Sequence, residues 1–323
     1  MNRLQQILAG ILALQIVIIA LAFWPRAIAS GAGAPVFLNL ETGDIVALII
    51  TDADGSSLVL RKQDEGWVLP DADGFPADAD KVSPLLERIT GLTTSRLVTR
   101  TSASHKRLQV SADDFVQRID LETANGEQHT LFLGSAPQYG AMHFRVDGQN
   151  ETYLTGDFST WETRAQPAAW IDSSYVNLDE ASVRKMTLEN ANGSFTFARN
   201  QDENWTMAGL GSDETLDQAK VDSLVSRAAS VNMERPLGRE EQPEYRMDQP
   251  SAVVRLETAD KTITLRVGVL DPEEQTYVIN SSESPYYVQV PQSSVQELVE
   301  ETRDGFLQLP PTPTPEGQTG STG

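Results

Sequence analysis

The stretch IVALIITDADGSSLVLRKQDEGW, residues 45–67, decides the fold because it recurs without a gap as VRKMTLENANGSFTFARNQDENW, residues 183–205. The tryptophans that end the two stretches, Trp67 and Trp205, lie 138 positions apart (205 − 67). Each copy has the pattern of a strand, a glycine-containing turn, a second strand and a third strand that opens on the tryptophan. Such a period predicts one folded module written twice.

After the tryptophan, both copies change from the period of a strand to the period of a helix. Apolar residues at helical spacing run from Ala79 to Leu92 after a potential N-cap, Asp78. The same stripe runs from Leu216 to Val231 in the second copy. We therefore expect one amphipathic helix in each copy, packed against its strands.

The second half of each copy returns to strands and closes on a short helical stretch, residues 157–164 and 293–303. We predict an α+β fold: two tandem modules, residues 36–172 and 174–308, each a mostly antiparallel sheet with one main packed helix. The positions shared by the two copies, called here the repeat markers, are Gly55, Trp67, Val82, Leu85, Gly134, Tyr153, Gly193, Trp205, Val221, Leu224, Gly268 and Tyr287.

The N-terminal segment predicts a membrane anchor. Residues 4–23 are uncharged and predominantly apolar, and 20 residues of helix at about 1.5 Å each span the hydrocarbon core of a bilayer. We predict a cytoplasmic head at 1–3, a transmembrane helix at 4–24 and a linker at 25–35. The alternative is a cleaved signal peptide, because Ala27-Ile28-Ala29 has the form of a cleavage site. The short head and the long acidic body favour a single-pass protein of the cytoplasmic membrane with its body outside.

The composition of the chain predicts a disordered C-terminal tail and argues against nucleic-acid binding and cysteine chemistry. Residues 309–323, rich in Pro, Thr and Gly, predict a disordered tail. The chain has 46 acidic and 25 basic residues, a formal charge of −21, which disfavours binding to nucleic acid. It has no cysteine, so disulfides, thiolate nucleophiles and thiolate metal sites are excluded.

The pattern traced above resembles a known family, the domain of unknown function 4340. The proline, the Ala-Asp pair and the apolar stripe of residues 70–92 carry the resemblance, together with the paired strands that end in glycine and the late tyrosine. It covers about residues 45–165 and, more loosely, 183–305, where Ala208-Gly209 and Asp217-Gln218 replace the proline and the Ala-Asp pair. The resemblance implies a membrane-anchored protein associated with ABC-type export systems of the kind linked to gliding motility. It implies no catalytic residue.

Candidate metal and catalytic residues are few. The acidic run from Asp71 to Asp80 suits calcium, but its glycine is misplaced for an EF-hand loop and Val82 stands where the bidentate glutamate belongs. A turn and a helix cap explain the run better. The only histidines, His105, His129 and His143, form no metal-ligand spacing. No nucleophile elbow or phosphate-binding loop occurs, so we expect no enzyme, no cofactor and no metal.

These observations favour a non-enzymatic extracytoplasmic interaction or scaffold subunit of a membrane transport complex. Its contacts would be exposed sheet edges or the cleft between the modules, and its partners membrane transport or envelope proteins. The oligomeric state stays open. The alternative is an anchored glycan- or cell-wall-binding module, with Trp67 and Trp205 as stacking platforms, although their place before a core helix favours packing. A hydrolase with an unrecognised site is the second alternative, and it requires a pocket with convergent acids or His143.

Overall fold

The computed structural model describes residues 33–37, 40–64, 66–156 and 158–308. The predicted head, anchor and tail, and most of the linker, lie outside these residues. Within the described part of the chain, no helix is long and apolar enough to cross a membrane. The chain forms two compact units, Met1–Ser56 with Ser83–Arg164, and Ser57–Val82 with Ala165–Gly323.

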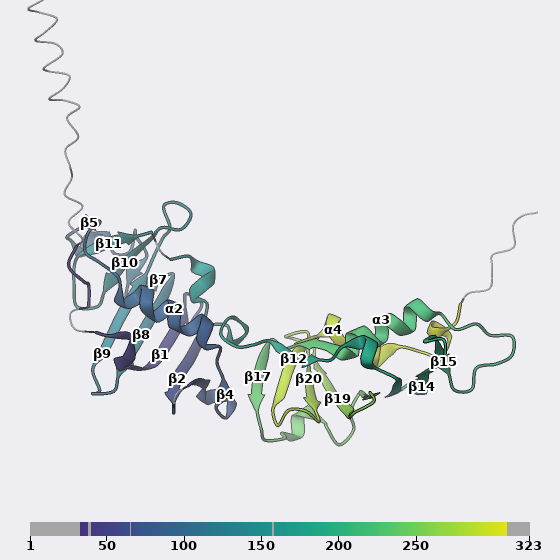
Figure 1. Cartoon of the computed structure of the whole chain (residues 1–323). Helices are drawn as coiled ribbons and strands as arrows, with labels where there is room; N and C mark the ends of the chain where they lie inside the picture. Colours follow the sequence, from purple (N-terminus) through teal and green to yellow (C-terminus); the bar gives the residue numbers. More distant parts are fainter. Residues whose placement is uncertain (1–32, 38–39, 65, 157, 309–323) are drawn as a thin grey trace, which may run out of the picture. The chain divides into compact units, whose positions relative to one another are not determined.

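The first large sheet has nine strands in the order β4-β3-β2-β1-β8-β9-β10-β11-β5 (Figure 1). Its β1–β8 ladder is antiparallel, with Leu48 opposite Leu121. The strands are β1 (Ile45–Asp52), β2 (Ser57–Gln63), β3 (Gly66–Leu69), β4 (Phe75–Pro76), β5 (Leu97–Thr99), β8 (Gln117–Thr123), β9 (Gln128–Leu133), β10 (Met142–Val146) and β11 (Thr152–Thr155). A separate small hairpin consists of β6 (Val110–Ser111) and β7 (Asp114–Phe115).

The second large sheet has eight strands in the order β15-β14-β13-β18-β19-β20-β21-β17. Its strands are β13 (Lys185–Asn190), β14 (Gly193–Arg199), β15 (Trp205–Met207), β17 (Arg235–Gly238), β18 (Ala252–Glu257), β19 (Thr262–Asp271), β20 (Thr276–Ser281) and β21 (Tyr287–Pro291). A two-stranded ladder pairs β12 (Ser174–Asn177) with β16 (Ser230–Asn232). Once β4 is left aside, the two large sheets have the same strand order, position for position.

Within the described residues, three α-helices accompany the sheets: α2 (Ala79–Thr90), α3 (Gln218–Ala229) and α4 (Gln292–Glu300). Asp217 caps α3 by accepting a hydrogen bond from the Lys220 amide, and the Asp78 carboxylate accepts one from the Asp80 amide at the start of α2. The apolar stripe of α2 is buried from Val82 to Leu92. Ala79 is exposed, because it stands in the first turn, before the helix reaches the core.

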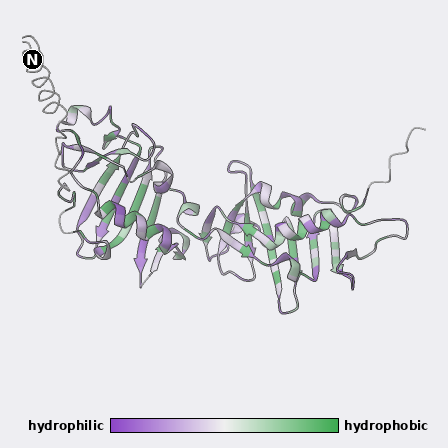
Figure 2. Cartoon of the chain, turned by 45° about the horizontal axis from the view of Figure 1, so that its top comes forward, coloured by the Kyte–Doolittle hydropathy of each residue, from purple (hydrophilic) through white to green (hydrophobic). Residues whose placement is uncertain are grey.

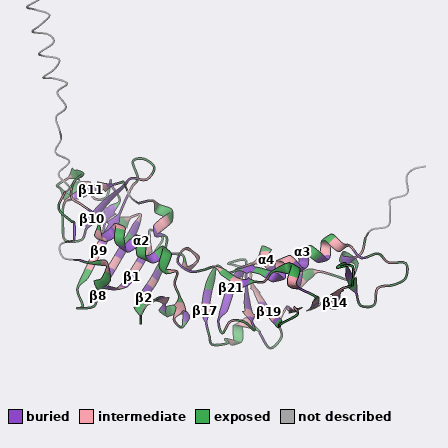
Figure 3. Ribbon diagram, in the orientation of Figure 1, coloured by how far each residue is buried: buried purple, intermediate pink, exposed green. Residues whose placement is uncertain are grey.

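The burial pattern follows the hydropathy pattern of the strands. Leu58 and Leu60 in β2 are buried with an intermediate residue between them, as are Phe195 and Phe197 in β14. Figure 2 shows apolar and polar residues alternating along strands, and Figure 3 shows buried positions concentrated in the sheets. The α+β class with mostly antiparallel sheets, predicted from these periods, is confirmed.

The closing helical stretches differ from each other. Residues 293–303 were expected to be helical, and α4 covers Gln292–Glu300 with Val295 and Leu298 buried. At 157–164, where a short helical stretch is also predicted, the described residues form a 3-10 helix, Thr160–Thr163. Phe158 and Thr163 are the fully buried side chains among the described residues of that stretch, and they lie five positions apart (163 − 158), so no apolar stripe at helical spacing holds a longer helix.

Candidate functional site

Two recesses of the second unit share the side chains of Arg235 and Leu237 on β17. Strand β17 is the last strand of its sheet and pairs with β21 on one side only. Its sequence, Arg-Pro-Leu-Gly, suits an edge, because a proline cannot donate a hydrogen bond to a neighbouring strand. The site is therefore built on an edge strand that lines both recesses.

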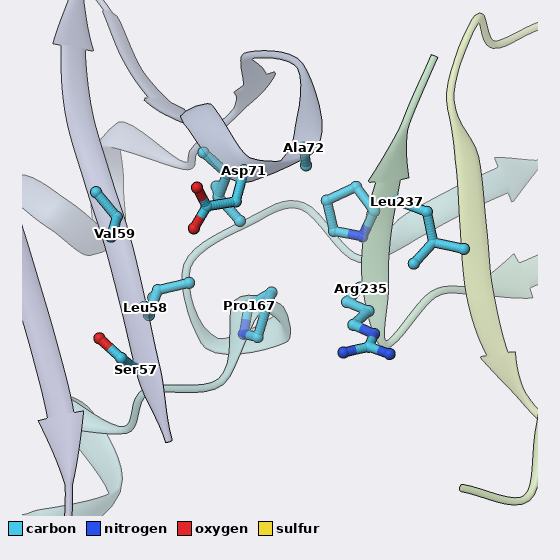
Figure 4. A pocket seen from close by; sticks show the side chains of 10 residues that line it. Ser57, Leu58, Val59, Asp71, Ala72, Pro167, Arg235 and Leu237 are labelled. Atoms are coloured by element: carbon cyan, nitrogen blue, oxygen red, sulfur yellow. The ribbon is translucent and has the colours of Figure 1, made fainter. Parts of the chain in front are cut away.

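The first recess has a volume of about 340 Å³ and is shown in Figure 4. Residues of β2, of the 3-10 turn Pro70–Ala72 and of β17 line it, and all belong to the second unit. Leu58, Pro167 and Leu237 supply apolar surface, while Asp71 supplies a carboxylate and Arg235 a guanidinium. This recess is mixed in character, with one charge of each sign on its wall.

The second recess is larger, about 490 Å³, and lies wholly within the second predicted module. Its apolar wall includes Leu237, Tyr245 and Val278, and the last two pack in a cluster with Met247 and Tyr287. The remaining lining residues that carry charge are Arg235, Glu244, Asp271 and Glu273. The recess thus combines an apolar wall with a predominantly acidic rim.

Arg235 is held in place by polar partners on its own sheet. Its guanidinium forms an ion pair of 3.0 Å with Glu274 and donates to the side chain of Gln289 on β21. Gln289 in turn donates to the same Glu274 carboxylate at 3.1 Å. Burial raises the pKa of Tyr245, and the carboxylate of Glu244 raises it further. The phenol is therefore a neutral hydrogen-bonding group at physiological pH.

The acidic run singled out in the sequence is dispersed by the structure. Asp71 lines the first recess, and the Asp73 carboxylate accepts a hydrogen bond of 2.7 Å from the main-chain amide of Arg239. Asp78 caps α2. Among the residues that the structure describes, no group of three His, Asp or Glu side chains lies close enough to hold a metal ion. The acids of this run serve backbone and surface roles instead.

The three histidines are not brought together. His105 contacts the carbonyl of Asn150 at 2.9 Å, and the ring of His129 packs edge-on against Phe37. His143 is buried on β10, where its Nδ1 lies 2.7 Å from the carbonyl oxygen of Ser135. None of the three lines either recess at β17. The hydrolase alternative requires a pocket with convergent acids or with His143. Neither recess contains His143, whereas Glu244, Asp271 and Glu273 line the second.

The tryptophans of the repeat face inward. Trp67 is 8% exposed and Trp205 is 3% exposed. The Nε1 of Trp205 donates to Asp222 at 2.7 Å, and the guanidinium of Arg199 lies 4.4 Å from the ring centroid. Neither indole ring leaves an open face on which a sugar could stack.

The other repeat markers lie in turns and in the cores of the sheets. Gly55 and Gly193 have positive φ angles of 88° and 144° at the first hairpin of each sheet. A Cβ at Gly134 would collide with the carbonyl oxygen of Leu108, and one at Gly268 with that of Tyr245. The buried markers are Val82, Leu85, Tyr153, Val221, Leu224 and Tyr287. None of the twelve markers lines either β17 recess.

The sequence reasoning missed the recess residues because they share no motif. Arg235, Tyr245 and Asp271 lie in three separate segments that the sheet brings together. The only local signal is the proline of β17, which marks an edge strand. The second recess brings carboxylates, one guanidinium, a phenol and apolar side chains together, an arrangement that suits contact with a basic and apolar group.

One family model matches the chain, over residues 67–215, and is described as a domain of unknown function, DUF4340. The match begins at Trp67 and ends ten residues after Trp205 (215 − 205), so it contains α2, the strands from β5 to β15 and the loop that follows them. The chain is similar to this family over that range. Searches of curated proteins and of solved structures returned no significant match.

Proposed function

We propose that this protein is a non-enzymatic, membrane-anchored interaction subunit whose two tandem modules stand outside the cytoplasmic membrane and accompany a membrane transport complex. The observation that carries the proposal is the second β17 recess, which has an apolar wall and an acidic rim but no paired nucleophile and base. An apolar wall of this kind suits an anchoring apolar side chain of a protein partner. The association with a transport complex is proposed from what the resemblance to the domain of unknown function implies.

The tandem arrangement is supported by the strand orders of the two large sheets, which agree position for position apart from β4. The hairpin glycines, the buried tryptophans and the helices that follow them recur in the same order. These features occur in both modules and stabilise the fold. Arg235 and its side-chain partners, Glu274 and Gln289, occur in the second module alone. We therefore assign partner binding to the second module.

The acidic rim of the second recess indicates the charge of the partner segment that it would bind. Glu244, Asp271 and Glu273 line the recess together with a single guanidinium, that of Arg235, which is paired with Glu274. A segment with Lys or Arg beside an apolar side chain complements this rim. The apolar side chain would enter beside Leu237 and Val278, and the basic group would meet Glu244 or Glu273.

Purification of the full chain in a mild detergent tests the association. We expect a permease, an ATPase or an envelope protein to co-purify with the wild type and to be lost from Leu237→Glu, which places a charge in the recess. Leu210→Glu is the matched control, because Leu210 is also half-buried but lies in the loop after β15. Glu273→Lys, on the exposed rim, should weaken the association without disturbing the core. Co-purification of no membrane or envelope protein would contradict the proposal.

Membrane attachment and orientation need a separate test. After an alkaline wash of isolated membranes, the full chain should stay in the membrane fraction. Protease added to cells with a permeabilised envelope and an intact inner membrane should digest the body. A body that is protected under those conditions would contradict the proposed orientation, and a chain released by the wash would contradict the anchor.

A further inference from the structure

The end of the first sheet at β5 carries an exposed patch that is both apolar and basic. Leu97 and Val98 are 38% and 42% exposed, two of the four large hydrophobic side chains that stand out from the described surface. Arg96 and Arg100 flank them and are also exposed. Strand β5 is the last in its sheet and pairs only with β11, so one edge of its backbone is open.

A third exposed hydrophobic residue, Tyr139, belongs to the same region. It is 95% exposed and sits in the turn between β9 and β10. A Cβ at the next residue, Gly140, would lie 3.8 Å from the carbonyl oxygen of Gly156, and a Cβ at Gly156 would lie 3.7 Å from a guanidinium nitrogen of Arg96. Arg96, Leu97, Val98, Arg100 and Tyr139 are called here the β5 patch.

The local charge is opposite to that of the whole protein. From Ile89 to Ala112 the sequence contains Arg96, Arg100, Lys106 and Arg107 but no acidic residue, in a chain with a formal charge of −21. Lys106 is paired with Asp113 at 2.7 Å. Neither Arg96 nor Arg100 forms an ion pair with a carboxylate of the described residues. Among the described residues, Glu151 lies near the patch, where its charge acts on Tyr153 of the neighbouring strand β11.

The patch lies where the described chain begins. Residues 33–36 run against the segment before β5: the Thr94 amide donates to the carbonyl of Ala34 at 3.0 Å, and Pro35 bridges to Thr93. A Cβ at Gly33 would collide with the main-chain nitrogen of Ser95, one residue before Arg96. The chain therefore enters its first module beside the β5 patch (Figure 1).

We propose that the β5 patch docks on the surface of the membrane, with Leu97, Val98 and Tyr139 in the interface and Arg96 and Arg100 on anionic lipid headgroups. This inference rests on the proposed anchor at residues 4–24. The nine residues from 25 to 33 reach at most about 30 Å when fully extended. An anchor ending at residue 24 thus keeps β5 close to the bilayer, where tyrosine, exposed apolar groups and arginine are favoured.

Single-cysteine labelling tests the docking, because the chain has no cysteine of its own. An environment-sensitive fluorophore on Val98→Cys reports the patch. Ser56→Cys is the matched control: it is exposed in the turn between β1 and β2, and β1 lies five strands from β5. At about 4.8 Å per strand this places it roughly 24 Å away across the sheet. The labelled full-length proteins are reconstituted in vesicles of equal parts phosphatidylcholine and phosphatidylglycerol, and iodide quenching measures exposure to water.

We expect quenching at position 98 to be several-fold weaker than at position 56. The double substitution Arg96→Gln with Arg100→Gln should remove most of this difference, as should vesicles of phosphatidylcholine alone. Arg61→Gln with Lys62→Gln removes the same charge from β2, where both side chains are exposed, and should leave the difference intact.

Two outcomes overturn the inference in distinguishable ways. If the chain resists an alkaline wash of the vesicles but positions 98 and 56 are quenched equally, the anchor stands and the docking is wrong. In that case the open backbone edge of β5 would be available to pair with a strand of another protein. If the wash releases the chain, both the anchor and the docking are wrong.

Discussion

Gly134 and Gly268 hold equivalent places in the two large sheets, because each allows a main-chain carbonyl to approach where a Cβ would lie. The carbonyl of Leu108 approaches Gly134, and that of Tyr245 approaches Gly268. Gly134 directly follows β9, and Gly268 lies within β19, which are matching strands in the two orders. In both cases the approaching carbonyl belongs to a turn that folds over the sheet beside a small apolar cluster. Both glycines are therefore required by packing rather than by a positive φ angle.

Alanine at either glycine should destabilise the protein. We expect Gly134→Ala and Gly268→Ala each to lower the free energy of unfolding by about 1–3 kcal/mol, because the backbone must shift to admit the methyl group. The measurement is urea unfolding followed by circular dichroism. Gly66→Ala is the control, since a Cβ there meets nothing within 4 Å. Equal stabilities of all three variants would show that the close approaches are absent.

Replacement of the buried tryptophans should unfold the modules rather than abolish a binding activity. Trp67→Ala and Trp205→Ala should each cost about 3–5 kcal/mol, because each removes a large side chain from a core. Trp161→Ala should cost less than about 0.5 kcal/mol, because this ring is 59% exposed. Thermal unfolding separates the two classes. A folded Trp205→Ala protein that had lost binding to a polysaccharide would favour the glycan-binding alternative instead.

Tyr175 should make the second unit sensitive to alkaline pH. Burial raises the pKa of Tyr175 to about 12 from the usual 10.0, and its hydroxyl donates to the carbonyl of Tyr286 at 2.7 Å. Because the folded state holds the phenol proton more tightly than the unfolded state, this stabilisation is complete below about pH 10. It is lost as the pH rises from about 10 towards about 12.

The variant Tyr175→Phe isolates this effect. At neutral pH it should lose about 1–3 kcal/mol, because the amide of Ser281 and the carbonyl of Tyr286 lose their partner. Its free energy of unfolding should then fall less steeply than that of the wild type above about pH 10. Tyr139→Phe, at an exposed position, is the control and should keep the wild-type stability at neutral pH. Parallel pH curves for Tyr175→Phe and the wild type would contradict the assignment.

The elements with a strong local period could be predicted from the sequence. Leu58 and Leu60 alternate with a less buried residue, and apolar residues recur at helical spacing after Asp217. Such periods predict the buried face of a strand or helix, because spacing along the chain sets which side chains share a face. The short strands β4, β5 and β17 have two to four residues, too few to show a period. Their places are set by partners far along the chain, as when Pro236 pairs with Val288.

The candidate site could not be predicted for the same reason. Arg235 gains its role from Glu274 and Gln289, which lie 39 and 54 positions further on. Asp73, from the acidic run considered as a calcium site, instead accepts a hydrogen bond from a main-chain amide. A recess formed by three or more segments leaves no spacing that a single sequence can reveal.

Cross-linking from the second β17 recess in intact cells tests whether a membrane transport or envelope protein binds there. Leu237→Cys carries a thiol-linked photo-crosslinker into the recess, and Ser194→Cys, exposed on β14, is the control in the same unit. We expect a discrete adduct with a membrane transport or envelope protein from position 237 and none from position 194. Adducts of equal pattern from both positions, or none from position 237 in a folded protein, would contradict it.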